Sequence, residues 1–329
     1  MNWYPWLNPS YKKIIDHHQQ GRAHHALLIY SIKDMGDDKL VWGLSRWLMC
    51  QKRKGLKSCG NCHGCQLMQA HTHPDWYRLE AQPGQTSVGV DAVRHIVEKL
   101  YHCAQQGGAK IVWLPYSSRL TESAMNSILK ILEEPPKNCW FFFSSIEPSY
   151  LLVTLRSRCM IISVCPPSEI TSLQWLKIQQ CTQPTEILIT ALRLSNGSPA
   201  AALSLLRSNR WCIRKIFCKK LLNSLNNDVL ELLPILNTDH MSDYLNWLIS
   251  ILVDVIKVHY GASNWLNNSD CQDIVMQLSK KFKPNSLQED IQKWMKCRKQ
   301  LEDIAGLNRE IILTDRLLTW SSLITPLTS

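Results

Sequence analysis

The chain has 329 residues, 45% of them hydrophobic and 19% charged, which is ordinary for a globular protein and enough for two or three domains. The N-terminus lacks the basic and apolar regions of a signal peptide, and no run of about 18 uncharged apolar residues is present. We therefore expect a cytoplasmic protein with no membrane partner; the formal net charge of +10 permits an anionic partner such as nucleic acid but does not require one.

The first half of the chain alternates between two patterns. Apolar runs typical of strands lie at 25–30, 75–81, 110–115, 139–145 and 159–164, and amphipathic segments typical of helices lie at 38–50, 90–105 and 122–134. This alternation predicts an α/β layer with a mostly parallel sheet. The last of these helices is expected to face the core with Ile128, Leu129, Ile131 and Leu132, and to end before the two prolines that follow it.

The second half of the chain shows only helical periods. The segment CPPSE breaks the alternation, and after it a short helical set runs to about 208 and a longer set to the end. In WLISILVDVIKVHY, Asp254 and Lys257 interrupt the apolar residues, which predicts an amphipathic helix with one polar face. We therefore predict an α/β plus all-α protein with three domains, at 1–165, 166–208 and 209–329.

A loop between the first strand and the first helix, SIKDMGDD, lies where a nucleotide-binding protein holds a phosphate. A P-loop needs glycines, a lysine for the phosphates and a hydroxyl for Mg²⁺. Here only Gly36 fits: Ser31 and Asp34 replace glycines, Asp37 replaces the lysine, and Asp38 replaces the hydroxyl residue. The two helix-start carboxylates favour the helix dipole but repel a triphosphate. The loop is predicted to bind no ATP.

The strand at 110–115 gives an independent indication of whether the chain could hydrolyse ATP. In an ATPase this strand ends in acidic residues that hold Mg²⁺ and orient the attacking water. Here Pro115 and Tyr116 stand in those places. We therefore expect no ATPase or other catalytic site in this chain.

Four of the thirteen cysteines fall in one window, CQKRKGLKSCGNCHGC. Their spacing is C-x8-C-x2-C-x2-C, with Cys50, Cys59, Cys62 and Cys65 as the candidate ligands. Tetrahedral zinc takes four thiolates, and C-x2-C turns supply them in pairs. A site that uses all four cysteines has no open position, so the prediction is a structural zinc module at about 50–65.

Other interpretations of the cysteine window are less well supported. Disulfides are disfavoured in a chain without an export signal. An iron-sulfur cluster is the chemical rival, but the ferredoxin pattern continues with x3-C-P, whereas QLMQAHTH follows Cys65. Three nearby histidines, His63, His71 and His73, are alternative ligands and are expected to be bystanders.

Several segments together resemble the clamp-loader branch of the AAA+ proteins. They include LTESAMNSILKILEEPP and LRSRC, and, more specifically, WYPWL, GRAHHALLI, MGDD, KSCGNCHGCQLMQAHTHPDWY and GVDAVR, which look like the delta-prime family of the bacterial DNA polymerase III clamp loader. LRLSNGSPAAAL and LNREIILTDRLL extend the resemblance over nearly the whole chain, though it thins between about 208 and 300.

The resemblance implies a fold and a set of partners. The α/β domain would be an AAA+ P-loop-type parallel sheet domain with the zinc module inserted, 166–208 a small helical lid domain, and 209–329 a helical collar that oligomerises. The partners would be gamma/tau-type ATPase subunits and a delta-type subunit in a hetero-pentamer that places a sliding clamp on primed DNA, contacted directly or through the complex. The chain would belong to a DNA-directed DNA polymerase holoenzyme, a nucleotidyltransferase as an assembly.

The same resemblance assigns one active element. The family's Ser-Arg-Cys motif corresponds to Ser157, Arg158 and Cys159. An arginine supplied in trans stabilises charge that develops on the γ-phosphate. Arg158 would donate that charge to the ATP site of a neighbouring subunit. Arg156 would project to the opposite side if the segment is extended.

Two other functions remain open from the sequence. An active AAA+ ATPase would require the missing lysine and carboxylates. A zinc-binding nucleic-acid module would require basic residues interleaved with aromatics in the cysteine segment. That segment has Lys52, Arg53, Lys54 and Lys57 but no aromatic residue, so a solvated loop is the preferred interpretation.

Overall fold

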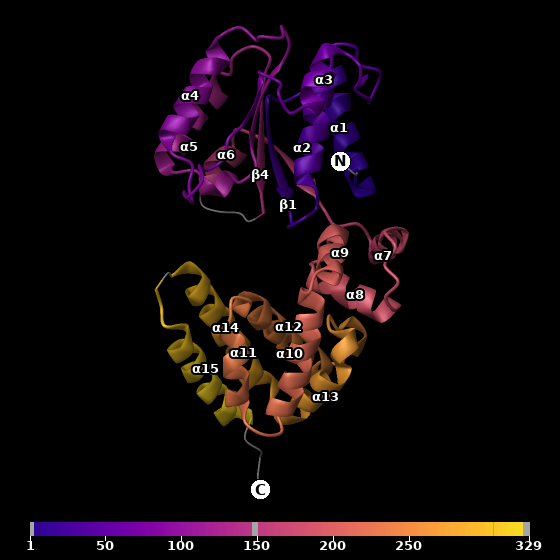
Figure 1. The fold of residues 1–329 in the computed structure, drawn as a ribbon, viewed down its shortest axis with the longest axis vertical. Helices are drawn as coiled ribbons and strands as arrows, with labels where there is room; N and C mark the ends of the chain where they lie inside the picture. Colours follow the sequence, from indigo (N-terminus) through magenta and orange to yellow (C-terminus); the bar gives the residue numbers. More distant parts are fainter. Residues whose placement is uncertain (1–2, 147–150, 305, 325–329) are drawn as a thin grey trace. The chain divides into compact units, whose positions relative to one another are not determined.

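A computed structural model describes residues 3–146, 151–304 and 306–324. It forms two compact units, Met1–Pro166 and Pro167–Ser329 (Figure 1). The division falls between the two prolines of CPPSE, where the sequence changes from mixed strands and helices to helices alone. No helix in the described ranges is long and apolar enough to cross a bilayer.

The first unit is built on one sheet of five parallel strands. The strands are β1 (Ala26–Ser31), β2 (Trp76–Arg78), β3 (Lys110–Leu114), β4 (Cys139–Ser145) and β5 (Met160–Val164), in the order β2-β3-β4-β1-β5. The predicted parallel sheet is confirmed. Central strands carry nearly continuous apolar residues because both faces of the sheet are buried.

Helices cover the two faces of this sheet. They are α1 (Asn8–Gln19), α2 (Asp37–Leu48), α3 (His63–Gln69), α4 (Val90–Tyr101), α5 (Glu122–Glu133) and α6 (Leu151–Arg156), with short 3-10 turns at Pro5–Leu7 and Ser117–Arg119. Figure 1 shows α1, α2 and α3 on one side and α4, α5 and α6 on the other. Alternate residues of β1 enter separate cores: Leu27 packs with α1 and α2, and Leu28 with α4 and α5.

Helix α5 follows its sequence signals closely. The hydroxyl of Thr121 caps the helix by accepting a hydrogen bond from the Ala124 amide at 3.3 Å. The helix ends at Glu133, ahead of the two prolines. Of its four expected core residues, Leu129 is only partly buried and the other three are buried.

The second unit is helical throughout its described residues. Its helices are α7 (Glu169–Ile178), α8 (Thr185–Leu194), α9 (Pro199–Arg207), α10 (Arg210–Ser224), α11 (Leu233–Leu236), α12 (Met241–His259), α13 (Gln272–Lys281), α14 (Pro284–Asp303) and α15 (Arg309–Ile324). A single apolar core runs from Leu176 to Trp320. Gly197, at φ +82°, follows α8, and Pro199 opens α9.

Asp254 of α12 corrects the expectation of a polar helix face. Its side chain is fully buried and accepts hydrogen bonds from Lys257 Nζ at 2.8 Å, the Asn267 amide at 2.9 Å and the Asn268 amide at 2.7 Å. A buried carboxylate persists only when its oxygens are satisfied in this way. The charge therefore anchors a loop against α12 and does not mark a solvent-facing side.

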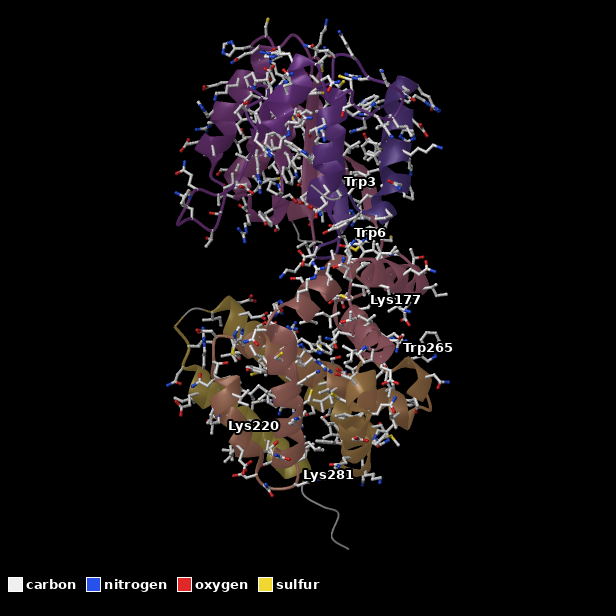
Figure 2. All side chains as sticks on the ribbon, turned by 45° about the vertical axis from the view of Figure 1, so that its right-hand side comes forward. Trp3, Trp6, Lys177, Lys220, Trp265 and Lys281 are labelled. Carbon is white, nitrogen blue, oxygen red and sulfur yellow. The ribbon has the colours of Figure 1, made fainter. Side chains whose placement is uncertain are left out.

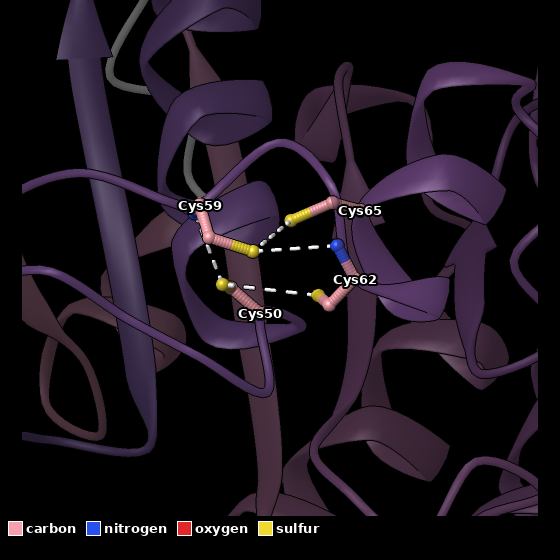
Figure 3. A group of neighbouring side chains, drawn as sticks. All are labelled: Cys50, Cys59, Cys62 and Cys65. Carbon is pink, nitrogen blue, oxygen red and sulfur yellow. Dashed lines mark hydrogen bonds between the residues drawn. The ribbon is translucent and has the colours of Figure 1, made fainter.

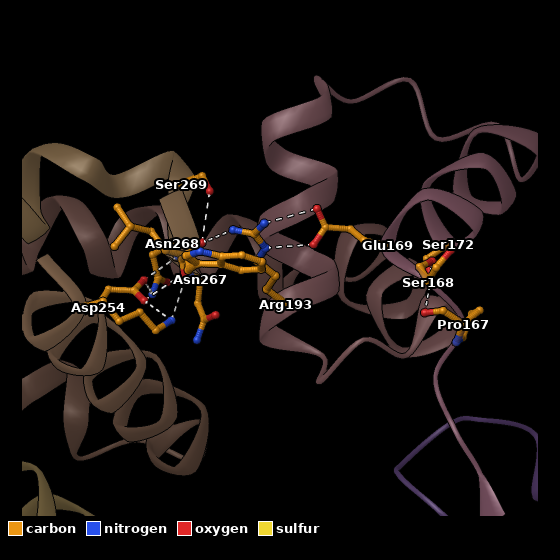
Figure 4. Close-up of polar contacts among 12 residues, drawn as sticks. Pro167, Ser168, Glu169, Ser172, Arg193, Asp254, Asn267, Asn268 and Ser269 are labelled. Atoms are coloured by element: carbon orange, nitrogen blue, oxygen red, sulfur yellow. Dashed lines mark hydrogen bonds and ion pairs between the residues drawn. The ribbon is translucent and has the colours of Figure 1, made fainter. Parts of the chain in front are cut away.

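Arg193 of α8 ties the first three helices of this unit to the rest of it (Figure 4). Its guanidinium contacts Glu169 of α7 at 3.1 and 3.3 Å and also donates to the carbonyl oxygen of Leu266. Leu266 lies directly before the loop that Asp254 holds. Polar contacts and the shared core thus join α7–α9 to α10–α15.

Candidate functional site

The loop within SIKDMGDD follows the carboxyl end of β1. This strand pairs with β4 on one side and β5 on the other, and the chain passes from it to the distant edge strand β2. In open α/β sheets ligands bind at such a switch in strand order. The loop is therefore where a nucleotide would be expected.

The loop's backbone is a tight turn that ends in helix α2. Gly36 precedes the helix at φ +88°, and Asp34 has φ +60°. Asp37 opens the helix half-buried, and burial raises the pKa of its carboxyl while a hydrogen bond with Ser144 opposes that shift. Asp38 follows in the same turn. The structure thus places carboxylates, as the sequence predicted, at the helix end that would face a phosphate.

Aromatic residues from the start of the chain cover this loop. The Tyr4 ring lies so close to Gly36 that a Cβ on the glycine would be 2.6 Å from Tyr4 Cδ2. Trp6 Nε1 donates a hydrogen bond to the carbonyl oxygen of Met35 at 2.9 Å. The Tyr4 and Trp6 rings stack at 4.6 Å, and Lys39 Nζ lies 3.6 Å from the Tyr4 ring centroid. Lys39, in the first turn of α2, therefore contacts an aromatic ring of the same chain.

These aromatic contacts were not foreseen from the sequence. WYPWL has three aromatic residues in five positions and directly precedes α1 (Figure 2 labels Trp3 and Trp6). Such density is a usable signal for packing, but the target of the packing depends on tertiary structure.

The end of β3 carries no acidic pair. Tyr116 is about half exposed, and the guanidinium carbon of Arg119 lies 4.6 Å from its ring centroid. Ser117 Oγ donates a hydrogen bond to the carbonyl oxygen of Ser144 at 2.9 Å. These contacts fix the turn after β3 by side-chain packing.

Arg158 lies in a turn between α6 and β5. Its Nη2 and Nε lie 2.6 and 3.0 Å from Glu133 Oε1, and its Nη1 donates to Ser157 Oγ at 3.2 Å. The side chain stays 37% exposed. Glu133, the last residue of α5, is thus a partner of Arg158 that the sequence analysis did not identify.

The two flanking motif residues support this turn. Ser157 Oγ donates a hydrogen bond to the carbonyl oxygen of Thr154 at 2.8 Å, which ties the turn to α6. Cys159 is buried in the core beneath α5, and burial raises the pKa of its thiol to about 12. In this motif Ser157 thus holds the turn to α6, Arg158 is an exposed cation, and Cys159 packs in the core.

The conditional placement of Arg156 is corrected by the structure. This residue is the last of α6 and is exposed, and the segment that follows is a turn, so the chain here is not extended. The rule that alternate residues face opposite sides therefore does not apply. The helix itself was not predicted, because LLVTLR is only six residues long.

The loop after β1 and the Arg158 turn lie at opposite ends of two neighbouring parallel strands: the loop follows the carboxyl end of β1, and the turn precedes the amino end of β5. Leu27 pairs with Met160 and Ser31 with Val164, so β1 ends where β5 ends. The five residues of β5 span about 16 Å at roughly 3.3 Å per residue. Arg158 is therefore held away from this chain's own loop after β1.

The four predicted cysteines come together (Figure 3). Their sulfur atoms all lie within 4.8 Å of one another, with Cys59 and Cys65 at 3.9 Å and Cys50 and Cys62 at 4.0 Å. A tetrahedron of thiolates about 2.3 Å from zinc has sulfur atoms about 3.8 Å apart. The arrangement therefore fits a metal ion held by four thiolates.

Local backbone contacts support this arrangement. The Cys59 amide donates to Cys50 Sγ at 3.2 Å, and the Cys62 amide donates to Cys59 Sγ at 3.4 Å. Amide hydrogen bonds favour the ionised thiolate, and those from Asn61 and Cys62 lower the pKa of Cys59. Cys50 follows the end of α2 and Cys65 lies in α3, so a bound metal would join two helices.

Neighbouring polar residues play other parts. His73 is buried and accepts from the Asp75 amide at 3.2 Å, and His71 stacks on Trp42 at 4.5 Å. Among the described residues no histidine joins the sulfur cluster. Arg53 differs from the expected solvated loop, since it donates to the carbonyl oxygens at the end of α2 and lies 4.5 Å from the Trp47 ring.

Three family models together cover most of the chain. The model for the DNA polymerase III delta subunit matches residues 7–168, the model for the AAA+ ATPase lid domain of DNA polymerase III subunit delta' matches 167–207, and the model for the C-terminal part of the delta subunit matches 208–322.

Curated relatives match over nearly the full length. DNA polymerase III subunit delta' of Yersinia pestis is 46% identical over 98% of this chain and 96% of its own length, and that of Escherichia coli K12 is 45% identical over 97% and 95%. The tau subunit of Escherichia coli K12 is 26% identical over 43% of this chain and 21% of its own length. On this evidence the chain belongs to the delta' subunit family of DNA polymerase III.

Proposed function

We propose that this chain is a clamp-loader subunit that hydrolyses no ATP itself and supplies Arg158 to the ATP site of a neighbouring ATPase subunit. The observation that carries the proposal is the contrast between two sites. The loop after β1 lacks the parts that hold a nucleotide, whereas Arg158 remains exposed and oriented in its turn.

The position of Arg158 supports action in trans. It precedes the amino end of β5, whereas the chain's own loop follows the carboxyl end of β1, about the length of β5 away. The exposed ion pair with Glu133 limits the orientations of the guanidinium but is weak enough to be exchanged for a phosphate. A guanidinium placed in this way neutralises charge on the transferring phosphoryl group.

The loop contacts support the absence of ATP binding. Tyr4 and Trp6 cover Gly36 and Met35, and Lys39 is turned to Tyr4. Asp37 and Asp38 add negative charge at the helix start. Binding a triphosphate would require moving the aromatic residues and placing its phosphates beside two carboxyl groups.

The cysteine cluster would hold zinc in a structural role. Four thiolates complete a tetrahedral site, which leaves no position for a substrate. The residues Cys50, Cys59, Cys62 and Cys65 would then bind the ion and fix the loop that joins α2 to α3. Metal analysis of the purified chain that finds iron and inorganic sulfide in place of zinc would contradict this assignment.

The proposed partners follow from the family. They are gamma/tau-type ATPase subunits and a delta-type subunit in a hetero-pentamer that places a sliding clamp on primed DNA. The three-part division at 1–165, 166–208 and 209–329 is part of the proposal, with the last part as the collar that holds the ring together. The similarity to the tau subunit of Escherichia coli, over 43% of this chain, supports a common ancestry with a tau-type subunit.

The decisive experiment is reconstitution of the complex with Arg158→Ala in this chain. We expect DNA-stimulated ATP hydrolysis at the neighbouring site to fall roughly 1,000-fold, since trans-acting arginines contribute about three to five orders of magnitude. Arg156→Ala is the matched control, because this exposed arginine lies two residues away and should leave the rate unchanged.

Two outcomes would contradict the proposal. Unchanged hydrolysis with Arg158→Ala would leave the chain a scaffold alone. Measurable ATP binding by the isolated wild-type chain, followed with a fluorescent ATP analogue, would show that the loop after β1 still works.

A further inference from the structure

A hollow of about 540 Å³ lies between α1, α2 and the loop 49–62, which joins α2 to α3 and contains three of the four clustered cysteines. It shares no lining residue with the loop after β1, the Arg158 turn or the four cysteines. A cavity of this size is within the range that holds a small ligand or one to three side chains of a partner. Its floor and its rim differ sharply in chemistry.

The floor is apolar and is built from the residues before α1, from α1 and α2, and from the loop after α2. The Trp3 and Tyr11 rings meet edge to face at 5.2 Å, and a Cβ at Gly43 would lie only 2.9 Å from Trp3 Cζ3. The glycine thus lets the indole lie against α2. Tyr11 Oη donates to the carbonyl oxygen of Leu56 at 2.9 Å, which holds the loop against α1, and the Leu56 side chain is 37% exposed.

The rim carries three cations and no acidic residue. Lys12 of α1, Arg46 of α2 and Lys57 of the loop all line the hollow. Within the described ranges none of the three forms an ion pair. Arg46 Nε is in addition a buried donor with no acceptor. Positive charge at this hollow is therefore uncompensated.

This combination selects the chemistry of the occupant. An apolar floor takes a hydrophobic side chain, and unpaired cations around it take carboxylates. A nucleic-acid strand instead needs a basic groove that follows its backbone with aromatic faces free for stacking. Here the Trp3 and Tyr11 rings meet edge to face and Trp3 lies against α2, so the two rings do not line up as parallel faces for stacked bases.

We propose that this hollow binds a short acidic segment of a partner protein. One apolar side chain of that segment would lie on Trp3, Tyr11 and Leu56. Its carboxylates would meet Lys12, Arg46 and Lys57. The contact would be independent of Arg158 and of ATP hydrolysis.

The test uses the full chain and two pools of fluorescein-labelled octapeptides. The acidic pool contains four Asp or Glu and two Leu or Phe at random positions, and the neutral pool replaces the acids with Asn and Gln. Fluorescence anisotropy should show the acidic pool binding at least about 10-fold more tightly, with affinity falling as salt rises.

Two double variants separate the site from overall charge. Lys12→Glu with Lys57→Glu should weaken binding of the acidic pool by about 10-fold or more. Lys13→Glu with Lys52→Glu removes the same charge from the same helix and loop, at exposed residues outside the hollow, and should weaken it less than about 3-fold. Leu56→Glu, a loop substitution, should also abolish the preference for the acidic pool.

Several results would overturn the proposal. Equal losses in the two double variants would show that only the net charge matters. Equal binding of the two pools, or no binding at 1 mM peptide, would remove the acidic occupant. Tighter binding of a 20-nucleotide oligothymidylate that is lost with Lys12→Glu and Lys57→Glu would assign the hollow to nucleic acid instead.

Discussion

The loop after β1 and the turn before β5 belong to neighbouring strands of one sheet, yet they differ in exposure: aromatic residues cover the loop, and the turn leaves a charged side chain exposed. The loop contains Gly36 and is covered by Tyr4 and Trp6. The turn leaves Arg158 37% exposed, with its guanidinium paired to Glu133. Under the proposed function the loop needs no room for a nucleotide and can be filled by packing contacts, whereas the exposed arginine would act on a neighbouring subunit.

The largest expected effect comes from disturbing the contact between Gly36 in the loop and the Tyr4 ring that covers it. Gly36→Ala should lower the free energy of unfolding by about 2 kcal/mol, because the new Cβ meets Tyr4 and the residue has a positive φ. Urea unfolding of the full chain measures the change.

A second variant separates the two causes. With Tyr4→Ala already present, Gly36→Ala should cost only about 1 kcal/mol, since the backbone strain remains but the contact is gone. Equal costs in the two backgrounds would mean that Tyr4 does not press on the loop.

A smaller effect is expected from the carboxyl group of Asp37. Burial raises its pKa, so its ionised form costs stability at neutral pH, and that cost disappears as the pH falls through the raised pKa. Asp37→Asn should therefore be more stable than the wild type at pH 7 by less than about 1 kcal/mol, and the difference should shrink as the pH falls through the raised pKa and be lost near a pH of about 4. A difference in unfolding midpoint that stays constant from pH 7 to pH 3.5 would argue against this origin.

The smallest effect concerns the partner of Arg158. Glu133→Gln keeps a hydrogen-bond acceptor but removes the charge, so hydrolysis by the reconstituted complex should fall only about two- to five-fold. Glu134→Gln is the matched control at the next position and should not change the rate. A loss as large as that of Arg158→Ala would mean that Glu133 contacts the reacting groups itself.

Local signals foretold much of the molecule. The strands, the parallel sheet, helix α5 with its stop before two prolines and the convergence of the four cysteines follow from periodicity, proline placement and ligand spacing. These features depend on residues close in the chain or on one repeated pattern. Short α6 was an exception, because its six residues carry only a weak pattern.

Long-range contacts explain what the sequence could not show. Asp254 was assigned to a polar face, but residues 267 and 268 return to bury and satisfy it. Glu133 meets Arg158 across 25 positions, and Trp6 reaches Met35 across 29. Charge and aromatic content mark such residues as noteworthy, while their partners depend on how the chain folds back.

The Arg193 bridge and the single core of the second unit bear on how this half of the protein loses structure. The family models end one part at 207 and begin the next at 208, but apolar packing continues from Leu176 through Trp320. Segments that share a core open together as one cooperative unit. Amides in the middle of α8 and α12 should accordingly show similar protection from hydrogen exchange. A destabilising substitution in α7–α9 should lower the protection in α10–α15 as well, and the reverse should also hold.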